Sequence, residues 1–279
     1  MKRTITQQVT GHRTVDGAGV SLVRVLGHDT VQAFDPILML DSFDSTNPDE
    51  YTAGFPLHPH RGIETISYVY KGKMKHKDTI GNTDTVSDGE VQWMNSGSGI
   101  MHAEEVPAAD RLLGVQLWLN LPAAQKMSSP TYRALHVEDI PEVAIEGGRI
   151  RVLAGAYGEV EGHKSEHLPF TYYDIHLTKG AKIGLPTVHD DSIMLFTLKG
   201  EAIIDGVVVQ EKTAVKLSEG DSILIEAAGD SSQVLFMASR ALKEPVAWAG
   251  PIVMNTQEEL AQASRELQDG TFIKEGMEY

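Results

Sequence analysis

The chain reads HPHRGIET at residues 58–65 and GEVQWMNSGSGIMHAE at residues 89–104. The first stretch begins with two histidines two positions apart, and the second ends with His102-Ala103-Glu104. Side chains two positions apart in an extended strand lie on the same face of the sheet. His58 and His60 would therefore point the same way, and so would His102 and Glu104. Two such strands could direct four ligands at one point, which predicts a metal site built on β-structure.

The donor set of this predicted site narrows the choice of metal. Three imidazoles and one carboxylate suit a first-row divalent ion, and iron(II) is our first choice among iron, copper, nickel, manganese, cobalt and zinc. An octahedral ion would keep two positions open for water, substrate or dioxygen. A closed structural zinc site would more often use thiolates, and the chain has no Cys. A metal that only stabilises the fold is the alternative.

The remaining histidines show no second doublet of this kind. We interpret them as surface or hydrogen-bonded residues: His12, His28, His76, His136, His163, His167, His176 and His189.

Length and composition predict a globular protein. The chain has 279 residues, of which 41% are hydrophobic, enough for one large domain or two of ordinary size. The N-terminus has no apolar stretch after its basic residues, and no run approaches the ~20 apolar residues of a membrane span. The lack of Cys is compatible with a reducing compartment. We therefore expect a cytoplasmic protein with no membrane partner.

The charge balance speaks against direct nucleic-acid binding. The chain carries 24 Lys and Arg against 39 Asp and Glu, a formal net charge of −15. Nucleic-acid affinity depends largely on cationic groups that displace counterions. The acidity is consistent with solubility alone, or with a protein partner.

Short runs rich in Val, Ile and Tyr recur along the chain, separated by Gly, Asp and Asn. This pattern predicts an all-β sandwich or barrel. The expected strands cover residues 20–26, 64–70, 89–94, 113–119, 172–177, 193–198, 202–204, 214–217, 222–225 and 234–238.

One helix of about fifteen residues is expected near the C-terminus. Thr256 and Glu259 have the spacing of a capping box, and Gly270 stands where a helix would stop. The apolar stripe of this helix would be formed by Leu260, Ala263 and Leu267.

An internal repeat predicts two related β domains. YVYKG at residues 68–72 recurs as FTLKG at 196–200, and SDGEV at 87–91 recurs as SEGDSI at 218–223. Chance similarity between strand-and-turn sequences is the alternative. We place the domains at residues 1–130 and 131–279, with the helix in the second. Counting back from the repeat puts Pro186 and Val188 where the first domain has His58 and His60. Only the first domain should therefore bind metal.

The two motifs closely resemble the signature motifs of pirins, which are members of the cupin superfamily. The resemblance continues in QLWLNLP at residues 116–122 and GPIVMNT at residues 250–256, so it covers nearly the whole chain. It implies an all-β bicupin: two stacked antiparallel β-barrels of jelly-roll type with a short C-terminal helix. By motif position, it places the metal ligands on His58, His60, His102 and Glu104. Ile63 departs from the aromatic residue common in the family, and Asn95-Ser96 replace a frequent Thr-Ala.

The resemblance also implies a function. Similar proteins are associated with quercetin 2,3-dioxygenase activity, in which a flavonol and dioxygen react at the metal and carbon monoxide is released. Glu104 would then be catalytic, accepting the proton of the flavonol hydroxyl as well as ligating the metal. The alternative is a metal- or redox-sensing regulatory protein that binds an enzyme or transcription factor. Glu64 would either support a ligand imidazole or Arg61, or start a strand and point outward.

Overall fold

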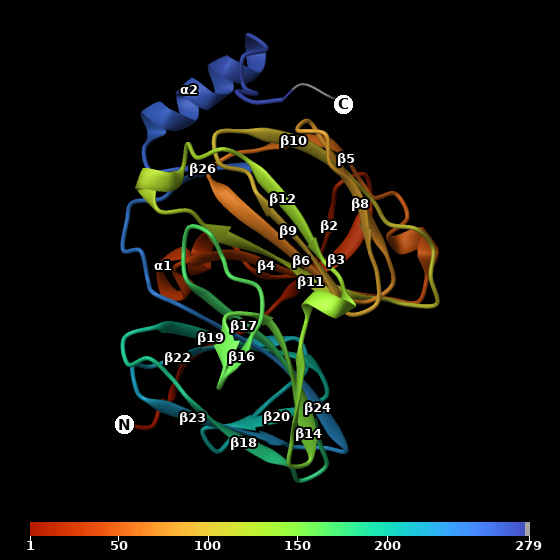
Figure 1. Ribbon diagram of the computed structural model, residues 1–279, viewed down its shortest axis with the longest axis vertical. Coiled ribbons are helices and arrows are strands. Elements are labelled where there is room, and N and C mark those ends of the chain that lie inside the picture. The colour runs from red at the N-terminus through yellow and green to blue at the C-terminus, as the bar shows by residue number, and fades with distance from the viewer. Residues whose placement is uncertain (277–279) are drawn as a thin grey trace. The chain divides into compact units, whose positions relative to one another are not determined.

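The computed structural model describes residues 1–276 (Figure 1). Backbone contacts divide the chain into two compact units. The motif unit contains both histidine motifs and comprises Arg13–Asp29, Ile37–His136 and the residues from Leu242 onward. The companion unit comprises Met1–His12, Thr30–Pro36 and Val137–Ala241.

Two antiparallel sheets build the motif unit. A seven-stranded sheet has the order β12-β9-β6-β11-β4-β3-β2, and a four-stranded sheet has the order β5-β10-β7-β8. The strands are β2 (His12–Asp16), β3 (Val20–Leu26), β4 (Ile37–Ser45), β5 (Phe55–His60), β6 (Ile63–Lys71), β7 (Met74–Asp78), β8 (Thr83–Val86), β9 (Glu90–Asn95), β10 (Ile100–Glu105), β11 (Leu112–Asn120) and β12 (Thr131–Leu135). A hairpin of β25 (Ala247–Ala249) and β26 (Ile252–Met254) precedes helix α2 (Gln257–Gln268).

The companion unit has the same design. Its seven-stranded sheet has the order β1-β22-β19-β24-β17-β14-β13, and its four-stranded sheet the order β18-β23-β20-β21. The strands are β1 (Ile5–Thr10), β13 (Glu142–Ile145), β14 (Gly148–Ala154), β15 (Ala156–Tyr157), β16 (Val160–Glu161), β17 (Phe170–Thr178), β18 (Lys182–Pro186), β19 (Ser192–Lys199), β20 (Ala202–Ile204), β21 (Val207–Val209), β22 (Thr213–Leu217), β23 (Ser222–Ala227) and β24 (Ser231–Ser239). The short helices of the chain are η1 (His28–Thr30), α1 (Val31–Phe34), η2 (Pro48–Glu50), η3 (Ala123–Gln125) and η4 (Val137–Asp139).

The matching strand orders confirm the repeat. In this comparison β6 corresponds to β19, and the ligand strands β5 and β10 correspond to β18 and β23. The turns after β6 and β19 both require glycine, because Gly72 has φ of 104° and Gly200 has φ of 69°. The all-β class, the two jelly-roll domains and the short C-terminal helix are thus confirmed, although each unit is a pair of open sheets rather than one closed ring of strands.

The two compact units follow different boundaries from the expected division at residues 130 and 131. Strand β1 pairs with β22, so the first residues of the chain complete a sheet of the companion unit. The C-terminal segment, with α2 packed on β25 and β26, belongs to the motif unit. Both differences arise because hydrogen-bonded pairing joins segments that are far apart in sequence, which local patterns do not report.

Apolar side chains fill the interior of the companion unit where the motif unit has its histidines. Ile183 and Leu185 on β18, and Ile223 and Ile225 on β23, belong to one buried hydrophobic cluster. The equivalence of Pro186 and Val188 with the ligand positions was wrong, because Val188 is 68% exposed and lies beyond the end of β18. The inward positions of the equivalent strand hold Ile183 and Leu185 instead.

Each of the ten expected strands corresponds to a strand of the structure, with ends that differ by a few residues. The expected helix is α2, which has 12 residues rather than about fifteen. Thr256 accepts a hydrogen bond from the Glu259 amide and completes the expected capping box. Ala263 is buried, whereas Leu267 is 37% exposed, so the buried stripe is narrower than expected. No helix within residues 1–276 is long and apolar enough to cross a membrane.

Removal of the Thr256 side chain should loosen α2 selectively. Thr256→Ala loses the hydrogen bond to the Glu259 amide, and loss of such a cap costs about 1 kcal/mol. Hydrogen–deuterium exchange of the α2 amides should accelerate roughly fivefold, while strands of the companion unit exchange as before. Thr256→Ser keeps the hydroxyl and should restore slow exchange. Equal exchange in the Ala and Ser variants would contradict the role of this cap.

Candidate metal centre

Strand pairing brings the two histidine motifs together. Strands β5 and β10 are antiparallel neighbours, with His102 directly opposite His58 and Ile100 opposite His60. Because alternate residues of a strand share a face, this register places the side chains of His58, His60 and His102 on one side of the four-stranded sheet. The pairing becomes irregular between His102 and Glu104.

The three imidazoles converge through their Nε2 atoms. Nε2 of His58 lies 3.0 Å from Nε2 of His60 and 3.0 Å from Nε2 of His102. The ligand atoms of all three lie within 4.8 Å of one another. His60 and His102 are buried, and His58 is partly exposed.

Backbone carbonyls fix the protonation of two of these rings. Nδ1 of His58 lies 2.8 Å from the carbonyl oxygen of Pro56, and Nδ1 of His60 lies 3.2 Å from that of Pro251. A carbonyl oxygen only accepts, so each Nδ1 carries a proton, and in the neutral form of the ring Nε2 then keeps the lone pair. Burial, followed by the charge of His58, holds the pKa of His60 well below its usual value. Burial and the neighbouring imidazoles lower the pKa of His102 in the same way.

This arrangement fits a transition metal. Neutral imidazoles with Nε2 lone pairs directed at one another repel unless a cation lies between them. Two imidazole nitrogens bound at ~2.1 Å to one ion, at right angles, would themselves lie ~3.0 Å apart, which matches the separations found here. The group of His58, His60 and His102 could therefore hold one metal ion through three nitrogens on one side of it.

Glu104 lies beside this group but faces other partners. Its carboxylate accepts a hydrogen bond of 2.5 Å from Nε2 of Gln92, and Nε2 of Gln116 lies 3.4 Å from both carboxylate oxygens. Among the described residues, the group of ligand atoms within 4.8 Å of one another does not include it. Glu104 is buried and lines the same pocket as His58 and His60. Its role as the fourth ligand stays a prediction.

Glu64 is buried at the start of β6, so the outward orientation considered from the sequence was wrong. Its carboxylate accepts a hydrogen bond of 2.8 Å from Nε1 of Trp93. This bond ties β6 to the neighbouring strand β9. Support of a ligand imidazole by Glu64 stays a prediction.

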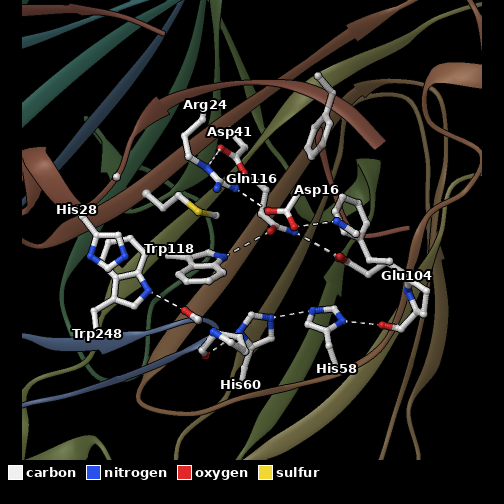
Figure 2. A pocket seen from close by; sticks show the side chains of 18 residues that line it. Asp16, Arg24, His28, Asp41, His58, His60, Glu104, Gln116, Trp118 and Trp248 are labelled. Carbon is white, nitrogen blue, oxygen red and sulfur yellow. Dashed lines mark hydrogen bonds and ion pairs between the residues drawn. The ribbon is translucent and has the colours of Figure 1, made fainter. Parts of the chain in front are cut away.

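A pocket of about 510 Å³ opens onto His58 and His60, and Figure 2 shows the side chains that line it. Aromatic rings form much of its wall. Trp118 meets the His60 ring edge-on at 5.2 Å between centroids, and Trp248 lies 5.7 Å from Trp118. His28 stacks on Trp248 at 4.0 Å. The volume falls within the range of about 300–1,000 Å³ typical of small-molecule sites.

A charged cluster forms the polar part of this wall (Figure 2). Nε and Nη2 of Arg24 donate to the two carboxylate oxygens of Asp41 at 2.9 and 2.7 Å, and Nη2 also reaches Asp16 at 2.7 Å. The hydrogen bond to Asp41 is the main cause that raises the pKa of Arg24. Burial alone would raise the pKa of Asp16, but the hydrogen bonds from Arg24 and the Gly17 amide lower it. The cluster offers acceptors for the hydroxyl groups of a ligand.

The C-terminal segment holds the corner that follows the His58 and His60 strand. The Arg61 guanidinium is buried, pairs with Glu266 at 2.7 Å and lies 4.1 Å above the Phe272 ring. Nζ of Lys126 donates to the carbonyls of Gly62 at 2.8 Å and Val253 at 2.9 Å. Burial lowers the pKa of Lys126 to about 7. A Cβ at Gly62 would lie 2.0 Å from the Val253 carbonyl, so only glycine permits this approach.

Sequence reasoning missed several residues of the site. His76 was interpreted as a surface or hydrogen-bonded residue, and it is hydrogen-bonded to Asp78. Its burial and its place behind His102, with 3.3 Å between the two Nδ1 atoms, were not foreseen. The signal was present, because His76-Lys77-Asp78 has the same two-residue spacing as the ligand doublets. His28 and Trp248 carried no such signal, since the fold alone brings them to the pocket.

A second group of ligand-type side chains, His189, Asp190 and Glu219, occurs in the companion unit. All three are exposed, and Nδ1 of His189 already contacts Asp221 at 2.9 Å. Its ligand atoms also lie within 4.8 Å of one another, but this surface group lacks the burial of the histidines in the motif unit.

Comparison with known proteins identifies the family of this chain. Residues 19–119 match the family model described as Pirin, and residues 172–273 match the Pirin C-terminal cupin domain. A pirin-like protein of Caulobacter vibrioides is 41% identical over 97% of this chain and 99% of its own length. Human pirin is 35% identical over 94% of this chain and 91% of its own length.

A solved structure is similar over the same length. The crystal structure of quercetin 2,3-dioxygenase from Acinetobacter baumannii superposes with a TM-score of 0.90 at 31% identity, covering 98% of this chain and 99% of that one. Both family models match this chain, and its relatives above 30% identity are covered over nearly their whole length. The chain belongs to the pirin family.

Proposed function

We propose that this pirin is a metal-dependent dioxygenase that cleaves flavonols of the quercetin type. The observation that carries the proposal is the convergence of three Nε2 atoms, two of them from His58 and His60, which line an aromatic-walled pocket of about 510 Å³. The similarity to the Acinetobacter baumannii quercetin 2,3-dioxygenase supports the choice of substrate.

The proposed metal is one iron(II) ion. His58, His60 and His102 would hold it through Nε2, and Glu104 is the proposed fourth ligand. When bound, such an ion supplies Lewis acidity toward the flavonol 3-hydroxyl and a redox centre for dioxygen. The reaction balances as one flavonol and one dioxygen giving one carbon monoxide and a ring-opened ester that contains the other atoms.

The residues of the chain have separate tasks in this scheme. Trp118 and Trp248 would contact the planar rings of the flavonol, and the Arg24 cluster would hydrogen-bond its phenolic groups. Glu104 would accept the proton of the 3-hydroxyl. The amides of Gln92 and Gln116 donate to the Glu104 carboxylate and would hold it in position for this transfer. The aromatic part of the pocket wall would limit the access of water to the reacting ring.

Quercetin turnover is the direct test. Protein loaded with iron(II) should consume one dioxygen and release one carbon monoxide per quercetin. His58→Ala removes one converging Nε2 and should lower turnover by more than about 100-fold. Loss of a residue that only hydrogen-bonds to a metal ligand already lowers metal affinity or activity about 10- to 100-fold. His12→Ala, at an exposed position outside the pocket, should leave turnover unchanged. Tight metal binding without oxygen uptake for any divalent ion would exclude the dioxygenase and favour the regulatory alternative.

Glu104→Gln should separate proton transfer from metal binding. The variant keeps the size of the side chain but removes the base, so kcat at saturating metal should fall by about 100- to 10,000-fold. Glu105→Gln is the matched control, because Glu105 is the exposed neighbour on β10 that pairs with Lys75. Wild-type kcat in Glu104→Gln would remove Glu104 from the mechanism, and wild-type metal affinity would remove it from the ligand set.

A further inference from the structure

His102 differs from the other two histidines of the centre. His58 and His60 direct Nδ1 at backbone carbonyls, whereas Nδ1 of His102 faces Nδ1 of His76 at 3.3 Å. A ring nitrogen can donate or accept, depending on its proton. The protonation of His102 therefore depends on that of His76.

His76 lies on β7 and is held from two sides. Its Nε2 is 2.8 Å from Oδ2 of Asp78, and both side chains are fully buried. Its ring stacks on Tyr132 with 4.0 Å between centroids and 10° between planes. Strand β7 is the neighbour of β10, with Asp78 opposite His102 and His76 opposite Glu104. The position and the plane of the His76 ring are thus defined by the sheet and by the stacking.

Asp78 is surrounded by hydrogen-bond donors. Oδ1 accepts from the backbone amides of Ile80 at 3.0 Å and Asn82 at 2.9 Å, and Oδ2 accepts from the Asn82 side chain at 2.9 Å. A carboxylate that receives several N–H donors is ionised and can only accept. The nitrogen of His76 that faces Oδ2 must therefore carry a proton.

This fixes the remaining protons in turn. A neutral His76 with its proton on Nε2 has a lone pair on Nδ1, so the facing Nδ1 of His102 must donate. Nε2 of His102 then keeps the lone pair that points at His58. The same result follows from the other end, because a metal bound at Nε2 of a neutral imidazole leaves the proton on Nδ1.

We propose that Asp78 and His76 are positioning residues that hold His102 in the tautomer able to bind metal. Asp78 and His76 keep the proton of His102 on Nδ1, as the carbonyls of Pro56 and Pro251 do for His58 and His60. In addition, the negative charge of Asp78, acting through the imidazole of His76, makes the Nε2 lone pair of His102 a stronger metal ligand. The inference rests on the proposed metal centre but not on flavonol turnover.

Asp78→Asn should reverse this order of protons. The backbone amides of Ile80 and Asn82 donate to Oδ1 of Asp78, so the side-chain oxygen of the substituted Asn must take the position of Oδ1. Its NH₂ group then takes the position of Oδ2 and faces His76. His76 would then carry its proton on Nδ1 and donate to His102, leaving the proton of His102 on the Nε2 that faces the metal. Zinc affinity, measured by chelator competition on the full-length protein, should fall by roughly 10- to 100-fold.

The matched control is Asp174→Asn in the companion unit. Asp174 is also buried and also accepts from a histidine two residues away, with Oδ2 2.8 Å from Nε2 of His176. This variant should keep wild-type zinc affinity. If Asp78→Asn and Asp174→Asn bind zinc equally well, the proposal is overturned.

Nitrogen-15 NMR of histidine-labelled protein gives a test that needs neither a variant nor turnover. In the wild type without metal, the long-range spectrum should show His102 protonated at Nδ1 and His76 at Nε2. Protonation of His102 at Nε2 would overturn the proposal. His76→Phe keeps a ring to stack on Tyr132 but removes the acceptor, and it should also lose zinc affinity roughly 10- to 100-fold. Correct tautomers with no quercetin turnover would retain this proposal and reject only the dioxygenase.

Discussion

The structure of the motif unit depends on three imidazole lone pairs that meet in a buried place. Neutral rings in this arrangement gain nothing from one another, and their burial depresses the pKa of His60 and His102. The arrangement persists because every Nδ1 has a partner of its own, two of them carbonyl oxygens and one the ring of His76. A cation at the meeting point would turn this repulsion into coordination, so the protein matrix is organised before any metal arrives.

The partners of the centre come from distant parts of the chain. Pro251 and Phe272 belong to the C-terminal segment, which reaches back to the corner after β5. Two buried cations, Arg61 and Lys126, fasten this segment to the ligand strand. Burial of a charge is costly unless hydrogen bonds compensate for it, and both cations have such bonds to backbone carbonyls. The C-terminal segment is thereby part of the candidate metal centre.

The companion unit shows that the fold and the site are separable. Its strand orders repeat those of the motif unit, yet the strands equivalent to β5 and β10 direct Ile and Leu side chains into a closed hydrophobic cluster. An apolar interior stabilises the sandwich by itself, since burial of each such side chain contributes about 1.5–3 kcal/mol. The motif unit has buried histidines and a pocket in place of such apolar side chains, so its interior contributes less hydrophobic stabilisation but provides nitrogen ligands. Fold alone would therefore not have identified which unit carries the chemistry.

Local patterns of the sequence determined much of this protein. The spacing of His58, His60 and His102 predicted their convergence, and the repeat predicted the two matching units. The pair of Thr256 and Glu259 predicted the cap of α2. These features depend on the two-residue period of strands and on short-range hydrogen bonds, and both are determined by residues close together in the sequence.

Only the tertiary structure decided the surroundings of the centre. It turned Glu104 toward Gln92 and Gln116 and placed His76 behind His102. It also brought Trp248 to the pocket and paired the N-terminal strand β1 with β22 of the companion unit. The physical reason is that these contacts join residues from 12 to more than 200 positions apart, through strand register and side-chain packing. A sequence pattern specifies which face a residue takes on its own strand, whereas the partner across the sheet is specified by the whole fold.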